Sequence, residues 1–119
     1  MCLIVVGWRV DPHFPLVVAA NRDEFHARPT AAAIFWADAP EVIAGRDLEA
    51  GGTWLGITRS GRFAAVTNVR EPGAIKGRHS RGRLTQNFLE GRHSAADHVA
   101  RIAMGEYSGF NLLVGDSRS

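Results

Sequence analysis

The sequence predicts an α+β fold in which antiparallel β-hairpins come first and two helices follow. Two pairs of apolar runs are each separated by turn-forming residues, which is the pattern of a hairpin. Two later segments have apolar residues at helical spacing, and each follows a serine and ends at a glycine. Separate groups of strands and helices are typical of the α+β class, and 119 residues suit one domain over residues 1–119.

The first hairpin is predicted from residues 2–9 and 16–20. The first run is apolar and rich in β-branched residues, and the second is short and continuously apolar, as in a strand buried on both faces. Residues 11–15 read Asp-Pro-His-Phe-Pro, which is a turn composition. The end of the second strand returns to the start of the first, so we expect Asp23 to lie near Cys2.

The segment from residue 25 to residue 40 has the composition of irregular structure. It contains Pro29, Pro40 and three consecutive alanines. We expect the adjacent aromatic side chains of Phe35 and Trp36 to anchor it to the core.

A second hairpin is predicted over residues 53–58 and 62–68. Gly51-Gly52 opens it, and a short strand over residues 42–44 precedes it. The strand over residues 62–68 is the more uniformly apolar of the two, so it should lie deeper in the fold.

Two helices are predicted over residues 81–90 and 94–104, followed by a last strand over residues 110–114. Ser80 and Ser94 have the residue type preferred at a helix N-cap. The faces expected to pack on the sheet consist of Leu84, Phe88 and Leu89 in the first helix and Val99, Ile102 and Ala103 in the second.

The composition favours a globular protein of the cytoplasm. Hydrophobic residues make up 45% of the chain, and no apolar run approaches the ~18 residues of a membrane span. The N-terminus lacks the pattern of a signal peptide, and a single cysteine fits a reducing compartment. A net charge of +2 is no footprint of nucleic-acid binding. Many arginines and alanines suggest a bacterial source with GC-rich DNA.

Cys2 is the first candidate for chemistry. If Met1 is removed, one residue carries a thiol and a free α-amine, whose ordinary pKa values are ~8.5 and ~7.7–8.0. The amine can then accept the proton of the thiol, so the chain terminus serves as the base of a nucleophilic mechanism. The alternative is that Cys2 is a small apolar residue at the start of a buried strand.

Seven motifs follow one another along the chain, namely Met1-Cys2-Leu3-Ile4, Ala20-Asn21-Arg22-Asp23-Glu24-Phe25, Gly45-Arg46-Asp47, Gly51-Gly52-Thr53-Trp54-Leu55-Gly56, Thr67-Asn68 with Arg70, Ser80-Arg81-Gly82 and Gly109-Phe110-Asn111-Leu112-Leu113. In this order they resemble the NRDE family, also called the transport and Golgi organization protein 2 family. The resemblance covers essentially the whole chain. Members of that family are about twice as long, so we expect this chain to be an N-terminal fragment with a missing C-terminal half. The alternatives are that another chain completes it, as in a homo-oligomer, or that the fold has been cut down.

The resemblance implies an N-terminal nucleophile hydrolase-like αββα sandwich, of which this chain is roughly the N-terminal half. The nearest branch comprises cysteine amidases such as penicillin V acylase and bile salt hydrolase. It implies that Cys2 is the nucleophile, that Asp23 orients the amine and that Asn68 stabilises the oxyanion. That branch has a catalytic arginine three positions before its aspartate, where this chain has Ala20, with Arg22 adjacent instead.

Four further residues are candidates for substrate binding. Strand alternation favours Asn21 and Asp23 on the side of the site and gives Arg22 a weaker claim. Arg70 shares with Asn68 the choice between an oxyanion-side role and a plain strand end. Arg81 lies where a helix N-terminus could bind a carboxylate or phosphate, as in an acyl-CoA or haem; the alternative is a solvated basic loop.

No cofactor or metal is predicted. The five histidines show no metal-binding spacing, and there is no haem-attachment motif.

Two functions are predicted, both with a small-molecule ligand and no nucleic acid. The first is a cysteine amide hydrolase acting on a small acyl-amide. The second is a non-catalytic carrier in which the same pocket binds haem or an acyl-lipid, because eukaryotic relatives are linked to Golgi organisation, lipid homeostasis and haem trafficking.

Overall fold

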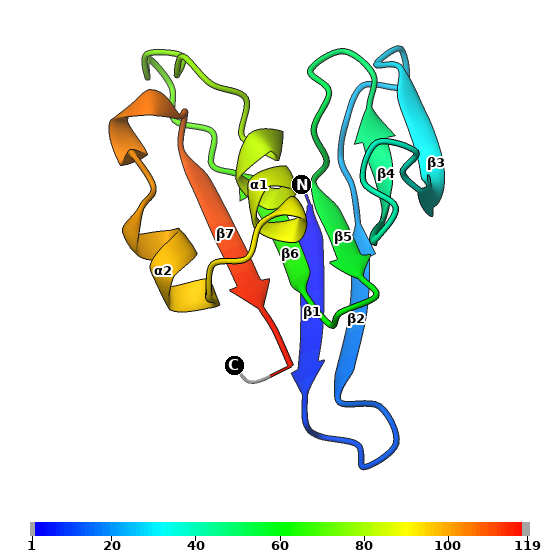
Figure 1. Cartoon of the computed structure of the whole chain (residues 1–119). Helices are drawn as coiled ribbons and strands as arrows, with labels where there is room; N and C mark the ends of the chain where they lie inside the picture. The colour runs from blue at the N-terminus through cyan, green and yellow to red at the C-terminus, as the bar shows by residue number, and fades with distance from the viewer. Residues whose placement is uncertain (1, 118–119) are drawn as a thin grey trace.

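The computed structural model describes residues 2–117 and shows an α+β fold with two antiparallel sheets (Figure 1). The first sheet is a hairpin, and the second has five strands in the order β3-β4-β5-β6-β7. No helix in this part of the chain is long and apolar enough to span a membrane. The elements are β1 Leu3–Trp8, β2 Leu16–Asn21, β3 Thr30–Phe35, β4 Val42–Asp47, β5 Leu55–Thr58, β6 Phe63–Asn68, α1 Gly82–Glu90, α2 Ala95–Ala100, the 3-10 turn η1 Met104–Glu106 and β7 Phe110–Gly115.

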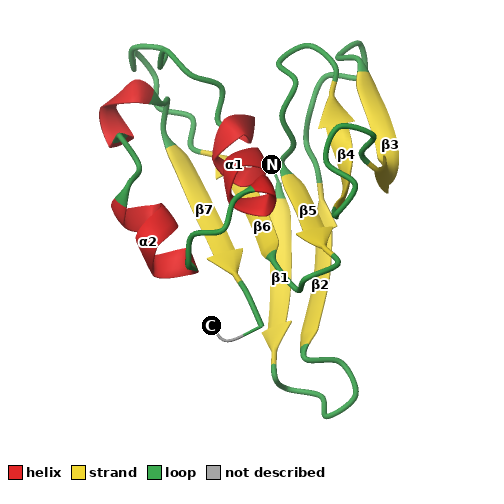
Figure 2. Cartoon of the chain, in the orientation of Figure 1, coloured by secondary structure: helices red, strands yellow, loops and turns green. Residues whose placement is uncertain are grey.

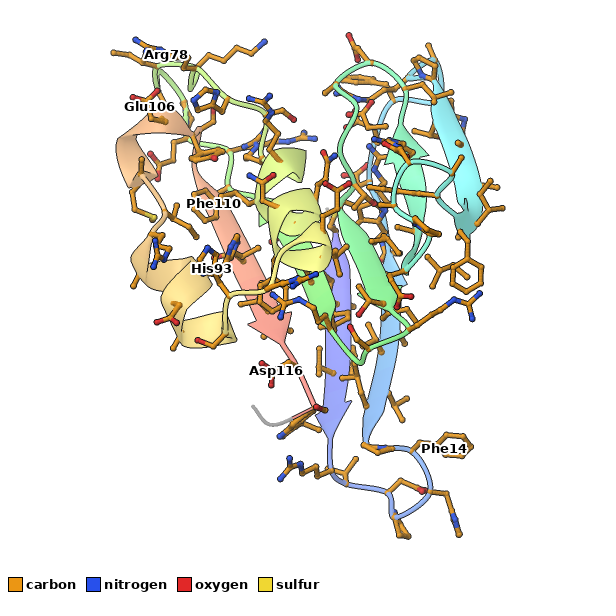
Figure 3. The ribbon with its side chains drawn as sticks, viewed as in Figure 1. Phe14, Arg78, His93, Glu106, Phe110 and Asp116 are labelled. Carbon is orange, nitrogen blue, oxygen red and sulfur yellow. The ribbon has the colours of Figure 1, made fainter. Side chains whose placement is uncertain are left out.

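The predicted first hairpin is confirmed. Leu3 pairs with Asn21 and Trp8 pairs with Leu16, so the end of β2 returns to the start of β1. The expectation that β2 is buried on both faces is wrong, since Val17 is 47% exposed and Val5 on β1 is 58% exposed. Apolar strands become buried only when another layer covers them, and residues 2–117 supply no layer that covers Val5 and Val17. The turn of the hairpin projects away from the other elements, and Phe14 extends from the side of the turn that leads into β2 (Figure 3).

The segment predicted to be irregular contains the edge strand β3. Thr30 pairs with Asp47 and Phe35 with Ile43, with a shift of register along the strand. The alanines between them have low strand propensity, so pairing with β4 rather than local preference determines the structure. Trp36 is 4% exposed, as expected, and its Nε1 donates to the Ala44 carbonyl at 3.1 Å. Phe35 is 42% exposed and does not anchor the segment.

The second hairpin is confirmed with slightly shorter strands. β5 and β6 pair from Leu55 opposite Ala65 to Ile57 opposite Phe63. The first four residues of β6 are all buried, which confirms that this strand lies deeper than β5. β7 then pairs along the whole of β6, so β6 is an interior strand of the sheet.

Helix α1 packs on strands β4 to β7 of the five-stranded sheet (Figure 2). Its predicted apolar face is confirmed, because Leu84, Phe88 and Leu89 are all buried. The predicted cap is wrong: the N-cap position is Arg81, and no side chain caps the helix there. Ser80 instead accepts the Arg83 N–H through its backbone carbonyl at 3.1 Å, as part of a turn that precedes the helix.

Helix α2 is shorter than predicted. Ser94 caps it as expected and accepts the Asp97 N–H at 3.1 Å, but the helix ends at Ala100. The Arg101 N–H closes the last turn, and the chain then forms the separate turn η1. No residue of α2 is buried and Val99 is 52% exposed, so the predicted apolar face of this helix does not form.

Candidate functional site

Cys2 lies in a polar pocket of about 110 Å³ where the start of the first hairpin meets the five-stranded sheet. Its side chain is partly buried, and its Sγ accepts a hydrogen bond from the backbone N–H of Asp23 at 3.2 Å. The hairpin therefore brings Asp23 back to Cys2, as the sequence predicted. The residues that line the pocket are Cys2, Arg22, Asp23, Glu24, Arg28, Asp47, Thr53, Trp54, Val66, Asn68, Ser80, Arg81 and Gly82.

One wall of the pocket depends on a close approach between Thr53 and the start of α1. The Thr53 N–H points to the Gly82 carbonyl at 3.4 Å, and the buried Thr85 hydroxyl donates to the Thr53 carbonyl. Gly52 is so near Gly82 that a Cβ built on it would lie 2.6 Å from the Gly82 carbonyl carbon. A glycine at position 52 is therefore required for the two chain segments to meet this closely.

Three residues implied by the family resemblance share this pocket. Cys2 and Asp23 come from the ends of the hairpin, and Asn68 ends β6, paired with Phe110 of β7. The side chains of Asp23 and Asn68 are exposed, which leaves them accessible to a bound molecule. This arrangement places a thiol, a carboxylate and an amide donor around one small space.

The structure exchanges the expected positions of Asn21 and Arg22. Arg22 lines the pocket and lies 3.7 Å from the Glu24 carboxylate, whereas Asn21 is not among the residues that line it. β2 ends at Asn21, so Arg22 and Asp23 lie outside the strand, and the alternation of side chains along a strand does not decide which way they face.

An ion pair between Arg28 and Asp47 forms a second part of the lining that sequence reasoning did not assign to the site. Arg28 donates to the Asp47 carboxylate through Nη2 at 2.6 Å and through Nε at 3.1 Å. Burial alone would raise the pKa of Asp47, but the hydrogen bonds from Arg28 and from the N–H groups of Glu49 and Ala50 outweigh it and lower that pKa. The sequence feature that could have indicated a role for Asp47 in the site was the Gly45-Arg46-Asp47 motif.

Arg81 lines the pocket at the start of α1, and its Nη1 donates to the Gly109 carbonyl at 2.8 Å. Burial lowers the pKa of this guanidinium, the positive charge of Arg70 lowers it further, and Glu24 opposes both effects. Arg70 is exposed and does not line the pocket.

No group of three or more histidine, cysteine, aspartate or glutamate side chains in residues 2–117 could hold a metal ion. The ionisable groups of the pocket are a thiol, carboxylates and guanidinium groups. What they can do without further groups is nucleophilic chemistry at Cys2 and binding of a polar or charged ligand.

Comparison with known proteins shows the family. The family model for Transport and Golgi organisation 2 matches residues 1–119. The chain is 39% identical to the Transport and Golgi organization protein 2 homolog of Bos taurus and 37% identical to that of Homo sapiens, each over 98% of this chain and 45% of the relative. It is 33% identical to Transport and Golgi organization protein 2 of Drosophila melanogaster, over 95% of this chain and 45% of the relative. The chain thus spans less than half the length of these relatives, and it belongs to the Transport and Golgi organisation 2 family.

Proposed function

We propose that this chain carries the nucleophile of a cysteine amide hydrolase with an N-terminal nucleophile hydrolase-like αββα architecture. The observation that supports this most strongly is the hydrogen bond from the Asp23 N–H to the Cys2 sulfur, within a pocket that Asn68 also lines. A cysteine that served only to fill an apolar core would be expected among apolar side chains. Cys2 has instead a lining that is largely polar and charged.

The reaction that these residues support begins with removal of Met1. The free α-amine of Cys2 accepts the thiol proton, and the thiolate attacks the amide carbonyl carbon to form a C–S bond. The side-chain amide of Asn68 donates to the developing oxyanion, and the Asp23 carboxylate orients the α-ammonium group. Cleavage of the C–N bond transfers the proton to the leaving amine. Water, deprotonated by the α-amine, then hydrolyses the thioester and releases the acid and Cys2.

A non-catalytic carrier is the second candidate, and two observations favour it. Ala20 occupies the position where the amidase branch has its catalytic arginine, and the named relatives are transport and Golgi organization proteins. In this alternative the pocket binds its ligand without turnover, and haem or an acyl-lipid remains the predicted cargo.

The test starts from the intact mass of the purified protein, which reports whether Met1 has been removed. The processed protein is then incubated with a panel of small acyl-amides, and the acylated thiol and released amine are measured. Cys2→Ala should abolish both signals while ligand binding persists. Asp23→Asn should slow acylation, whereas Asp11→Asn, the same change in the exposed turn of the same hairpin, should leave it unaltered.

Hydrolysis by Cys2→Ala at the wild-type rate would contradict the proposal. So would full activity in a preparation that retains Met1, because the proposed base would be absent. Ligand binding without acylation of processed protein would favour the carrier.

A further inference from the structure

Three arginines line the pocket around Cys2, and their ion pairing differs. Arg28 contacts Asp47 at 2.6 Å, and Arg22 lies 3.7 Å from Glu24. Arg81 has no carboxylate within ion-pair distance among residues 2–117; its hydrogen-bond partner is the neutral Gly109 carbonyl. A guanidinium has five N–H donors, and this one bond fixes its position without neutralising its charge.

A second arginine is brought to the same place by the backbone. The Gly109 carbonyl that accepts from Arg81 at 2.8 Å also accepts the Val69 N–H at 2.9 Å. The chain segments are in close contact here, since a Cβ on Gly109 would lie 3.1 Å from the Val69 carbonyl oxygen. Arg70 follows Val69 directly, and its charge acts on the Arg81 guanidinium.

Two neighbouring cations without a carboxylate partner repel each other, and a bound anion relieves that repulsion. Arg70 makes no ion pair within residues 2–117. Glu24, whose charge also acts on Arg81, is not within ion-pair distance of it, so the two arginines have no protein counter-ion in contact. Helix α1 begins at Gly82 and adds the partial positive charge of its N-terminus beside Arg81. The planar fork of a guanidinium matches the oxygens of a carboxylate or phosphate.

We infer that Arg81, assisted by Arg70, forms an anion-binding subsite at the edge of the Cys2 pocket, where the carboxylate or phosphate of an acyl-amide substrate binds. The inference rests on the proposed function for the nature of the substrate, and it deepens that function by giving the substrate an obligatory negative group. Arg22 and Arg28 have carboxylate partners and are not assigned to the subsite.

The test measures calorimetric binding of three probes to the 119-residue chain carrying Cys2→Ala, so that nothing is turned over. N-butyrylglycine carries a carboxylate, N-butyrylaminomethylphosphonate carries a phosphonate, and N-butyrylglycinamide is neutral. Both anionic probes should bind about tenfold or more tightly than the neutral one, as expected for a hydrogen-bonded charge. The tighter of the two shows which anion the subsite prefers.

Arg81→Gln should reduce that discrimination to within about twofold of equality, and Arg70→Gln should reduce it in part. Arg78→Gln is the matched control, because it removes the same charge from the loop before α1. The Arg78 side chain is 78% exposed, lies at the end of the molecule beside Glu106, and does not line the pocket (Figure 3). It should leave the discrimination unchanged.

Two results would overturn the subsite. One is equal loss of affinity for all three probes in Arg81→Gln, which would make Arg81 a structural residue that only supports Gly109. The other is an equal effect of Arg78→Gln, which would mean general attraction by net charge. If Arg81→Gln does not fold, Arg81→Lys replaces it, because lysine keeps the charge without the planar fork and should give intermediate discrimination. The subsite would likewise be overturned if folded Arg81→Lys and Arg70→Gln both discriminated between the probes as well as the wild type does.

Hydrolysis of the same probes by wild-type protein separates this inference from the proposed function. Binding that depends on charge and on Arg81, without acylation of Cys2, would support the subsite and contradict the hydrolase. Acylation with no preference for the anionic probes would support the hydrolase and overturn the subsite.

Discussion

Substitution of Gly52 by alanine tests whether its contact with Gly82 holds the pocket wall against α1. A Cβ at residue 52 would lie 2.6 Å from the Gly82 carbonyl carbon, and ordinary carbon contacts begin at 3.4 Å. The two segments must therefore separate by about 0.8 Å, the difference between these distances. The obstructing atoms belong to the backbone, so no side-chain rotation can relieve the clash.

The expected cost is about 1–3 kcal/mol of unfolding free energy, the usual range for overpacking a well-packed site. Gly82→Ala should be milder, since its Cβ would lie 3.2 Å from the Thr53 backbone and alanine is the better helix former. Gly105→Ala is the control: a Cβ there meets nothing within 4 Å, and its effect should stay within about 0.5 kcal/mol.

The measurements are urea unfolding of the three variants and the rate at which Cys2 reacts with a thiol reagent. Thr53 and Gly82 both line the pocket, so separating them should expose the sulfur and speed its modification in Gly52→Ala. An unfolding midpoint for Gly52→Ala equal to that of Gly105→Ala would refute the reasoning. Lost stability with an unchanged thiol rate would refute its link to the pocket.

Two other predictions concern polar side chains on the helices, one fully buried and one partly buried. Thr85→Val keeps the shape of a fully buried side chain but leaves the Thr53 carbonyl without its hydroxyl donor. Urea unfolding should show a loss of about 1–3 kcal/mol of unfolding free energy, which Thr85→Ser should largely avoid. Wild-type stability of Thr85→Val would contradict this prediction. Burial lowers the pKa of His98 below 6.5, and the charges of Arg62 and His93 add to the effect, whereas a hydrogen bond that the imidazole donates to the Leu84 backbone opposes it. The unfolded chain then binds more protons than the folded chain just below pH 6.5, so the stability contributed by neutral His98 is present above pH 6.5 and lost as the pH falls toward its folded pKa. Unfolding midpoints at pH 7.5 and 5.5 should differ less in His98→Leu than in the wild type, and an identical difference would contradict this.

The strands that could be predicted were those with a turn signal on one side and an apolar run on the other. β1, β2, β4, β5, β6 and β7 meet that condition, and all six form, although β4 is longer than predicted. β3 does not, because its alanines carry little β-propensity and its pairing with β4 supplies the structure. Burial was predicted less well than pairing: Val5 and Val17 are apolar but exposed, since pairing needs one neighbouring strand whereas burial needs another layer.

The helices show the same division between local and long-range causes. In α1 the helical spacing of the apolar residues places them on one face, and that face packs on the sheet, so the buried face of this helix was predictable. In α2 a suitable cap and apolar residues were present, but the helix has no buried contact to extend it beyond Ala100. In α2 the cap signal at Ser94 thus predicted the start of the helix but not its length, whereas in α1 the predicted cap at Ser80 was wrong.

The candidate site separates in the same way into a part that local reasoning reaches and a part that it does not. Pairing of β1 with β2 follows from the hairpin pattern, and it is enough to bring Asp23 to Cys2. Arg81 reaches the same pocket through contacts between distant segments, namely Gly52 against Gly82 and the Gly109 carbonyl against Arg81. Such contacts are missed when a glycine in the sequence is interpreted only as a turn former. A glycine also allows two backbone segments to approach closely, and this interpretation would have predicted the contacts. The proposed anion subsite at Arg81 therefore depends on the tertiary fold, and substitutions at these glycines should disturb ligand choice before they disturb the Cys2–Asp23 pair.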